Sequence, residues 1–407
     1  MEHGGSATGA DRPMAGVRVV DLGVFVAGPS TAAVLADWGA EVVKVEPPFG
    51  DPFRHMVSIG PDGVNPPFEL DNRGKRSIGL DLSTDGGRGV LERLLGEADV
   101  LSSNLRLGTL EGLGLHPDAL VERHPRLVVA TMNGFGDRGP DRDRPSYDMG
   151  GFWARSGLAA MHTVDGAEPP ILRGATGDHH SAMSLVAGIC AALYARDRTG
   201  RGGHVGTSLL RNGLWGLGQD AAFLMRTGLE MGSGGGRRAA PNPVYNPYRT
   251  ADGRWLWLLG LQPDRHWPLV AVALDRPEWL ADERFVDLPS RRQHGPALVA
   301  LMDEVFATRT LAEWAQVLEE AGVWWEPVLT LAEALDDPQT RASGVRVEVG
   351  ADGGPVPSVA SPVDFDGHTP VAGGTVPTYG QHTAEVLSEL GYDEAEVDAL
   401  RAAGAVT

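Results

Sequence analysis

Cysteine and the common hydrolase and metal motifs are almost absent from this sequence. Cys190 is the only cysteine among 407 residues, which excludes an intramolecular disulfide and a zinc site built on a CxxC pair. It lies in an apolar helical pattern, so we expect a buried thiol in a reducing, cytoplasmic compartment. No GxSxG or HExxH pattern occurs, so neither a serine hydrolase nor a zinc protease is supported.

Positive charge and long apolar runs are also scarce. The 35 Lys and Arg residues against 54 Asp and Glu residues give a formal net charge of −19, which disfavours nucleic acids and anionic membranes as partners. An anionic ligand would therefore need locally placed basic groups. No stretch reaches the roughly 18 uninterrupted apolar residues of a spanning helix. Residues 1–14 lack the apolar core of a signal peptide and predict a flexible tail.

What the sequence does contain is an alternation of strand and helix patterns. Residues 17–22 and 41–46 are buried-strand runs, and the helix predicted between them starts with Pro29 at its first position and ends at Gly39. Further strand-like runs occupy residues 77–82, 99–104 and 126–132, and a helical pattern covers residues 86–98. The alternation predicts an α/β fold with a parallel, doubly wound, Rossmann-like sheet.

The pattern changes after residue 224. Residues 228–247 are rich in Gly and Pro, and Asp252-Gly253 predicts the turn of a β-hairpin within residues 248–260. The tail at residues 380–400 is helical and is expected to pack back on the first domain. We therefore expect four segments. They are a flexible tail (1–14), the N-terminal part of a large domain (15–224), a smaller inserted α+β domain (225–330), and a linker with a C-terminal return to the large domain (331–407).

Two glycine-rich stretches deserve a comparison with nucleotide-binding loops. Residues 134–139 read GFGDRG, which fits GxGxxG, and they follow a predicted strand. The next residues, 140–148, contain two prolines where a dinucleotide site needs a helix N-terminus, so NAD and FAD are disfavoured. Residues 232–238 read GSGGGRR and lack the Walker Lys-Ser spacing, so they predict a mobile loop or a lid.

Asp178 stands where the run RGATG meets a long apolar helical pattern. An acid at such a junction can cap the helix, bind a metal or act as a nucleophile. Capping is favoured by residue type, since an N-cap Asp stabilises a helix by about 1 kcal/mol. A metal site with His179 and His180 is disfavoured because no further ligand pattern reinforces them, and we interpret these histidines as near-surface residues. Capping and nucleophilic attack are compatible, because the helix dipole favours the ionised carboxylate.

Six ordered motifs extend the analysis beyond single residues. They read LADWGAEVVKVEPP, NRGKRSIGLDL, ADVLSSNLRLGTLEGLGL, PRLVVATMNGFGDRGPDRDRPSYD, GDHHSAM and AGVWWEPVLTLAEALDDPQ. Together with GVRVVDLGVFVAGP at residue 16 and GQHTAEVLSELGY at residue 380, they resemble the family III CoA-transferases (CaiB/BaiF family), which include formyl-CoA transferase and carnitine CoA-transferase. The resemblance covers nearly the whole chain.

The resemblance implies a reaction and a set of site residues. Asp178 would be the nucleophile that moves CoA from an acyl-CoA donor to a free carboxylic acid, through an aspartyl mixed anhydride and an aspartyl-CoA thioester. No metal and no cofactor beyond CoA itself would be needed. Arg106 would be the phosphate partner, because its guanidinium fork matches phosphate oxygens. The implied CoA site consists of Val26, Ala27, Leu80, Asp81, Leu82, Ser83, Asn104, Leu105, Arg106, Tyr147 and Asp148.

The same resemblance implies an assembly and leaves other functions open. It predicts an interlocked homodimer, with Gly234, Gly235 and Gly236 in a lid. A related 2-methylacyl-CoA racemase would have a histidine where this chain has Tyr147, which favours the transferase. A non-catalytic acyl-CoA-binding homologue stays open, since Val26 stands where relatives commonly have a polar residue and Gly112 where they often have an arginine. Residues after Asp148 are similar to those of members that handle bulky aryl, hydroxyacyl or steroid-like acids, but the sequence names neither donor nor acceptor.

Overall fold

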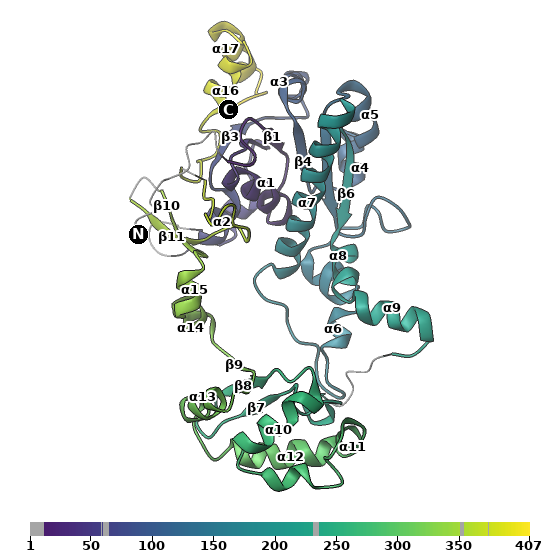
Figure 1. Cartoon of the computed structure of the whole chain (residues 1–407). Coiled ribbons are helices and arrows are strands. Elements are labelled where there is room, and N and C mark those ends of the chain that lie inside the picture. Colours follow the sequence, from purple (N-terminus) through teal and green to yellow (C-terminus); the bar gives the residue numbers. More distant parts are fainter. Residues whose placement is uncertain (1–11, 58, 60–64, 231–235, 351–353, 373) are drawn as a thin grey trace. The chain divides into compact units, whose positions relative to one another are not determined.

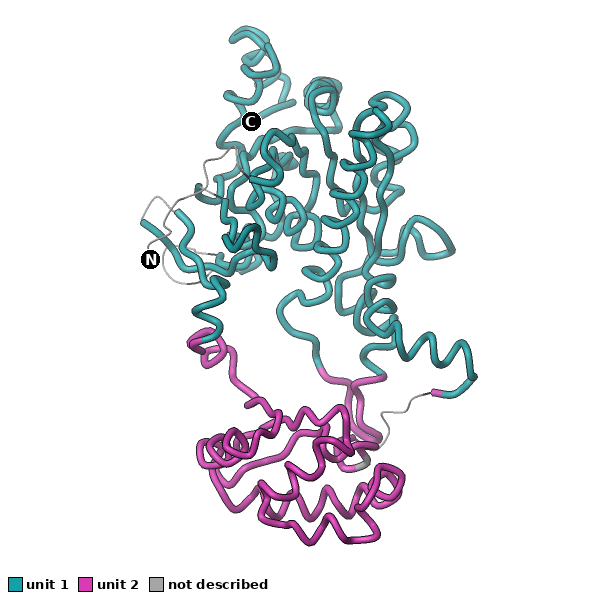
Figure 2. The backbone as a smooth tube through the Cα atoms, in the orientation of Figure 1, with its two compact units in different colours: residues 1–160, 171–229, 339–407 teal, residues 161–170, 230–338 magenta. Residues whose placement is uncertain are grey.

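The computed structural model of the chain describes residues 12–57, 59, 65–230, 236–350, 354–372 and 374–407. The chain divides into two compact units (Figure 2). Unit 1 contains residues 1–160, 171–229 and 339–407, and unit 2 contains residues 161–170 and 230–338. Gly234 and Gly235 of the predicted lid lie outside the described residues, as do residues 1–11 of the predicted tail. None of the described helices is long and apolar enough to cross a membrane.

A six-stranded parallel sheet forms the centre of unit 1 (Figure 1). Its strands are β1 (Arg18–Asp21), β2 (Glu41–Glu46), β3 (Lys75–Gly79), β4 (Val100–Ser103), β5 (Val128–Asn133) and β6 (Gly203–Ser208). They lie in the order β3-β2-β1-β4-β5-β6, and every neighbouring pair is parallel. This order is that of Rossmann-like folds, in which the direction of winding reverses between β1 and β4. The prediction of an α/β fold with a parallel sheet is confirmed.

Helices pack on both faces of this sheet. The helices of unit 1 are α1 (Ala27–Asp37), η2 (Pro52–His55), α2 (Pro66–Asn72), α3 (Asp85–Glu97), α4 (Leu107–Gly112), α5 (Pro117–Arg123), the π-helical turn η3 (Met149–Ala154), α6 (Leu158–Met161, at the border of unit 2), α7 (Thr176–Thr199), α8 (Leu209–Gly216), α9 (Gly218–Thr227), α15 (Pro338–Ala342), α16 (Thr383–Glu389) and α17 (Glu394–Ala402). A separate antiparallel pair is formed by β10 (Arg346–Val349) and β11 (Val356–Val359).

Successive strand residues contribute to two different hydrophobic clusters. Val20 and Leu101 belong to a cluster with residues of α3, α16 and α17, whereas Val19 and Val100 pack with residues of α1 and α7. Because neighbouring strand residues point to opposite faces, both faces of the sheet are buried. This explains why the strand segments are continuous apolar runs.

Several boundaries differ from the predicted ones, and for two of them the structure shows the cause. Helix α1 begins at Ala27 rather than at Pro29, because the Val26 carbonyl accepts the Ser30 N–H at 2.8 Å and completes a turn upstream of the proline. Pro29 is tolerated there, since the first N–H groups of a helix have no helical partner. Strand β3 covers 75–79 instead of 77–82, because its pairing with β2 ends at Gly79 and Leu80 forms a bridge with Val406 of the C-terminus.

The sequence patterns do not predict β6 or the division of the C-terminal helix. The segment of β6 starts with a glycine and carries one large apolar side chain, Val205, so its pattern does not predict a strand. The predicted C-terminal helix is two helices, α16 and α17, because Gly391 between them adopts a positive φ of 81°. The Asp81 N–H donates to the Ala405 carbonyl at 2.9 Å, so the last residues of the chain lie beside the segment that follows β3.

Unit 2 is a small α+β unit with a three-stranded antiparallel sheet. Its strands are β7 (Pro247–Arg249), β8 (Trp255–Leu258) and β9 (Trp325–Pro327), in that order across the sheet. Its helices are η4 (Gly236–Ala239), α10 (Pro263–Ala273), η5 (Pro277–Leu280), α11 (Leu288–Gln293), α12 (Gly295–Phe306), α13 (Leu311–Glu320) and α14 (Leu331–Asp336). The hairpin prediction is confirmed: Gly253 has a φ of 78° and donates to the Thr250 carbonyl.

Candidate functional site

A cavity of about 440 Å³ lies at the carboxyl ends of β1, β4 and β5 in unit 1. It is lined by residues 24–27 after β1, 104–106 after β4, 132–134 at the end of β5 and 144–147, together with Thr109, Asp178 and Leu209. Strands β1 and β4 flank the point at which the winding of the sheet reverses. Ligands of open α/β sheets bind at this point, since the loops on either side diverge and leave a crevice.

Most of the predicted site residues lie at this cavity. Val26, Ala27, Asn104, Leu105, Arg106, Tyr147 and Asp178 all contribute to its lining. Asp148 follows Tyr147, and its Oδ1 accepts the Met149 N–H at 2.7 Å at the start of η3. The remaining predicted residues lie elsewhere: Leu80 is buried in the core, and Asp81, Leu82 and Ser83 follow the edge strand β3.

Asp178 is held by the first turn of α7. This helix begins at Thr176, and its N-cap residue is Ala175, which has a φ of 54°. The prediction that Asp178 caps the helix is therefore wrong, because left-handed residues at Gly174 and Ala175 start the helix before the acid is reached. The neighbouring Gly177 has a clear steric role: a Cβ atom there would lie 2.6 Å from Cγ of Phe152. The Gly-Asp sequence thus lets α7 approach Phe152 closely.

The carboxyl group of Asp178 is in an unfavourable electrostatic position. Burial raises its pKa to about 7, and the carboxylate of Asp148 adds to the increase, while His179 opposes it. Among the described residues no hydrogen-bond donor reaches this carboxylate. Burial without a donor therefore acts against the helix dipole, which favours the ionised form of Asp178.

The two histidines that follow Asp178 bind different partners. His179 Nε2 lies 3.1 Å from Oδ1 of the buried Asp71, which also accepts the Ser30 hydroxyl at 2.8 Å. This hydrogen bond raises the pKa of His179. His180 is exposed, and its Nδ1 lies 2.7 Å from the Thr176 carbonyl. The interpretation as a near-surface residue is confirmed for His180, whereas His179 is half-buried and joined to the polar network beneath the cavity.

Asn104 lines the cavity but uses its amide within the protein. Its Oδ1 accepts the Val24 N–H at 2.9 Å, and its Nδ2 donates to the Val24 carbonyl at 2.7 Å. The side chain therefore fastens the loop after β1 in the way that a neighbouring strand would. The sequence predicts a ligand contact at this position but contains no signal for the loop contact.

Two arginines lie at the cavity, of which the sequence analysis singled out one. Arg106 is exposed, and its Nη1 donates to the Asp143 carbonyl at 3.1 Å, which leaves further N–H donors of the guanidinium group for an anion. Arg144 also lines the cavity and was missed. The overall charge of −19 makes such local basic groups the signal to look for. The residues that follow GFGDRG, up to the start of η3, form no helix, as the argument against a dinucleotide site predicts.

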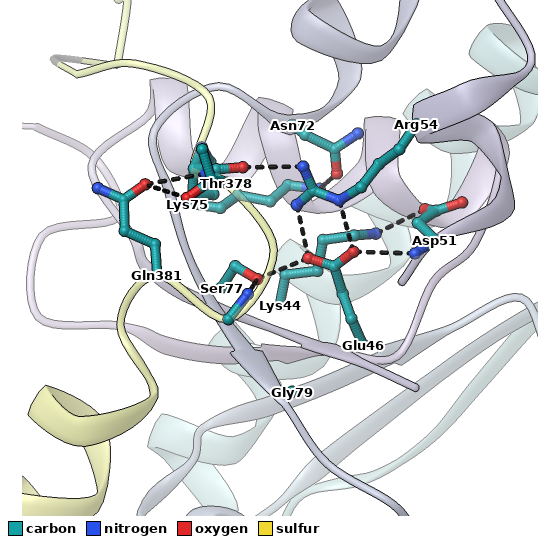
Figure 3. A network of polar contacts seen from close by, with 12 residues as sticks. Lys44, Glu46, Asp51, Arg54, Asn72, Lys75, Ser77, Gly79, Thr378 and Gln381 are labelled. Carbon is teal, nitrogen blue, oxygen red and sulfur yellow. Dashed lines mark hydrogen bonds and ion pairs between the residues drawn. The ribbon is translucent and has the colours of Figure 1, made fainter. Parts of the chain in front are cut away.

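A network of buried ion pairs lies beneath the loop after β1. Lys44 Nζ is 2.9 Å from Asp51 Oδ2, and Lys75 Nζ is 2.8 Å from Asp21 Oδ2; all four side chains are fully buried. Figure 3 shows Lys44 beside Asp51, with the Arg54 guanidinium against Glu46 nearby. Burial opposes the charge on Lys44, but the surrounding carboxylates outweigh it and raise its pKa. For Lys75 burial prevails and lowers the pKa to about 8. No sequence motif points to these pairs.

A family model described as CoA-transferase family III matches residues 14–383, from before β1 to the start of α16. The chain belongs to CoA-transferase family III. Both the predicted family and the predicted enzyme class, a CoA-transferase, are confirmed.

Named relatives of this family III CoA-transferase extend over almost the whole chain. The (R)-2-hydroxy-4-methylpentanoate CoA-transferase of Clostridioides difficile is 34% identical over 389 residues, which cover 94% of this chain and 96% of that protein. The cinnamoyl-CoA:phenyllactate CoA-transferase of Clostridium sporogenes is 32% identical and covers 95% of each chain. A crystal structure of a CaiB/BaiF family protein from Brucella suis has a TM-score of 0.81, is 30% identical, and covers 93% of this chain and 99% of its own.

Proposed function

We propose that this family III enzyme transfers CoA from an acyl-CoA donor to a free carboxylic acid, with Asp178 as its nucleophile. The observation that carries the proposal is the position of Asp178. It is a carboxylate without a hydrogen-bond donor among the described residues, in the wall of a cavity at the reversal point of the sheet. A carboxylate is the group that this chemistry needs, because it forms reversible, activated acyl intermediates.

The proposed reaction proceeds in four balanced steps. The Asp178 carboxylate attacks the donor thioester, forms a mixed anhydride and releases CoA as thiolate. The thiolate attacks the aspartyl carbonyl, which gives an aspartyl-CoA thioester and releases the donor acid as carboxylate. The acceptor carboxylate attacks this thioester, releases the thiolate again and forms a second mixed anhydride. The thiolate then attacks the acceptor carbonyl, which yields the new acyl-CoA and restores the Asp178 carboxylate. No net proton is consumed.

The electrostatic position of Asp178 supports these steps. Burial and the charge of Asp148 make its ionised form costly, as the raised pKa of about 7 indicates. The attack by Asp178 turns the half-buried anion into a neutral anhydride, which the thiolate then converts into a neutral thioester, and both forms avoid this cost. The same burial therefore favours the covalent intermediates over the resting carboxylate, provided that the carboxylate is ionised when it attacks.

For CoA itself we propose a site along the carboxyl edge of the sheet. Arg106 and Arg144 would contact phosphate groups, while Val26, Ala27, Leu105 and the Tyr147-Asp148 pair would lie near the thioester. Asn104 would act through the loop that it fastens. Asp81, Leu82 and Ser83 follow β3 at the same edge, and they would contact the adenosine end, whereas the side chain of Leu80 is buried in the core and would not. Residues 15–224 with the C-terminal segment would then form the CoA-binding domain.

The lining of the cavity favours an acid with a sizeable apolar group. Val24, Phe25, Met132 and Leu209 surround it together with the ring of Tyr147. The relatives named for 2-hydroxy-4-methylpentanoate and for cinnamoyl-CoA and phenyllactate suggest branched or aryl acids, including 2-hydroxy acids. We propose acids of this class as substrates, and a cytoplasmic location in keeping with the single cysteine.

We also propose that the enzyme is an interlocked homodimer. Helix α9 has no buried residue, and its Met225 is 81% exposed, while Trp215 in the preceding helix α8 is 82% exposed. Large apolar side chains in such a position favour burial against a second copy of the chain. Light scattering at several concentrations should give a stable dimer mass, and a monomer at micromolar concentration would contradict this part of the proposal.

Isotope transfer tests the reaction directly. With acceptor acid labelled by ¹⁸O in both carboxyl oxygens, one acid oxygen should remain on Asp178 after each turnover, and peptide mass spectrometry should locate it there. Peptides with Asp71 and Asp148 should stay unlabelled. Transfer of CoA without label on Asp178 would contradict the mechanism. Deuterium exchange at the α-carbon without any acceptor acid would instead indicate the racemase reaction.

A further inference from the structure

The loop after β1 contains a residue in a conformation that its side chain disfavours. Phe25 has a φ of 62°, in the left-handed region that glycine and asparagine populate and that bulky residues avoid. The residue lies between β1 and α1 and lines the cavity that contains Asp178. A phenylalanine at such a position has to be held there by its surroundings.

Buried side chains supply the restraint. The Phe25 N–H donates to Asp51 Oδ1 at 3.1 Å, and Asp51 Oδ2 accepts from Lys44 Nζ at 2.9 Å. The same Lys44 ammonium donates to the Gly23 carbonyl at 2.9 Å, and the Gly23 N–H donates to Asp21 Oδ1 at 2.7 Å. Lys44 and Asp51 lie side by side in Figure 3.

The hydrogen bonds on either side of Phe25 leave the loop little freedom. Both backbone groups of Val24 bond to Asn104, and the Val26 carbonyl accepts from the hydroxyl of Ser30 at 2.8 Å. The loop therefore gets its shape from side chains of four separate segments: β1, β2 and the turn after it, α1, and the residue that follows β4. Relaxation of Phe25 to a normal φ would break several of these contacts together.

The restraint places an aromatic ring at the cavity. The ring of Phe25 meets that of Tyr147 edge to face, with centroids 5.6 Å apart and an interplanar angle of 83°. Tyr147 is 64% exposed although it lines the cavity, so this ring pair has surface left for a ligand. Neither ring is needed to cover the hydrophobic core, because Phe25 is only half-buried.

We propose that Phe25 is a specificity-determining residue, which with Tyr147 forms an aromatic wall for an aryl or similarly bulky apolar acyl group. This rests on the proposed function, since the wall would contact the acyl group whose carbonyl Asp178 attacks. The strained backbone is kept because it is the conformation that turns the ring to the cavity. A residue with a purely structural role would instead be the glycine or asparagine that this φ favours.

Unfolding of two variants tests the backbone part of the proposal. Phe25→Ala and Phe25→Gly both remove the ring, but only glycine accepts the positive φ without strain. Phe25→Gly should therefore unfold at higher urea than Phe25→Ala, with a folding equilibrium constant larger by about 5- to 30-fold. At an ordinary position glycine is the less stable of the two, so an equal or lower midpoint for Phe25→Gly would overturn the assignment.

Binding of two ligands tests the specificity part. In the Asp178→Ala background, which prevents turnover, cinnamoyl-CoA and acetyl-CoA are titrated calorimetrically against the parent and against Phe25→Ala. Loss of the ring should weaken the binding of cinnamoyl-CoA by about 10- to 100-fold and the binding of acetyl-CoA by less than about threefold. Tyr194→Ala, at a ring of α7 that is 68% exposed and lies outside the cavity lining, is the control and should change neither. Equal weakening of both ligands, no weakening, or no binding of either ligand would overturn the proposal.

A failure of the proposed function would show in a different measurement from a failure of this proposal. The wild-type enzyme would then lack Asp178-dependent CoA transfer, whatever the ratio of its affinities for cinnamoyl-CoA and acetyl-CoA.

Discussion

The two sides of the cavity treat buried carboxylates in opposite ways. On the side of β1 and β2, Asp21 and Asp51 are fully buried, and each pairs with a lysine at 2.8 to 2.9 Å. On the side of α7, Asp178 is half-buried and receives no hydrogen bond from the described residues. A buried charge is tolerated when it is paired and is costly when it is not.

The difference separates rigidity from reactivity. The paired carboxylates hold backbone groups of the loop at residues 23–26, because their oxygens accept hydrogen bonds from lysines and from backbone N–H groups. Asp178 accepts no such hydrogen bond from the described residues, so its oxygens stay available to form a covalent bond. A carboxylate that is paired as Asp51 is would be less available to attack a substrate. A carboxylate without partners, such as Asp178, could not hold the loop in place.

Of the substitutions that test this comparison, removal of the Asp178 carboxylate should have the largest effect. Asp178→Ala should lower CoA transfer by about a thousandfold or more, because the residual binding groups cannot form the acyl intermediates. The free energy of unfolding should not fall, since the carboxylate makes no stabilising contact. Initial rates and urea unfolding measure the two quantities. Asp118→Ala, at an exposed carboxylate, is the control for activity. Near-normal transfer by Asp178→Ala would refute the assignment.

On the opposite side, removal of one partner should damage the fold. Lys44→Met leaves Asp51 buried without its cation, so we expect a loss of about 3–5 kcal/mol in the free energy of unfolding. The matched control is Arg18→Met, which breaks the exposed pair with Glu97 and should cost less than about 1 kcal/mol. Both are measured by urea unfolding. Similar losses for the two variants would mean that burial does not distinguish these pairs.

A smaller effect is expected where α7 meets η3. In Gly177→Ala the added methyl group would lie 2.6 Å from Phe152, so we expect a loss of about 1–3 kcal/mol from overpacking and a displaced Asp178. Gly112→Ala in α4 is the control, because no atom lies within 4 Å of its Cβ position and alanine favours helices. Thermal unfolding and transfer rates check both. Full activity and stability of Gly177→Ala would show that α7 can shift freely.

The sequence predicts the α7 side of the site better than the other. Asp178 and its glycine stand at a visible junction of patterns, and the strands flanking the cavity are apolar runs that pairing in a buried parallel sheet requires. By contrast, Lys44 and Lys75 lie within β2 and β3, where a lone charge gives no hint of its partner. Their carboxylates come from segments that only the folded sheet brings together. The positive φ of Phe25 is invisible for the same reason, since phenylalanine is not a residue that predicts it.

The pH dependence of Asp178 provides the finest test of the comparison. Its folded pKa of about 7 lies above the unfolded value near 3.8. The folded state thus binds the proton more tightly, and this contribution to stability is present below pH 4 and is lost as the pH rises through 7. Asp178→Asn cannot ionise, so its stability relative to the wild type should increase from pH 4 to pH 8. We expect a modest change, because residual exposure screens the charge.

The activity of the wild type should rise over the same pH range in which the stability contribution of Asp178 is lost. Attack needs the ionised carboxylate, so kcat/KM should rise with pH and level off above about 7. Urea unfolding of both proteins between pH 4 and pH 8 and a pH–rate profile of the wild type measure the two trends. A carboxylate with the ordinary pKa of an aspartate, near 3.8, would instead give a profile that is flat from pH 5 upwards. Such a profile, with equal pH dependence of the two stabilities, would mean that the surroundings of Asp178 do not disfavour its charge, and it would contradict this part of the comparison.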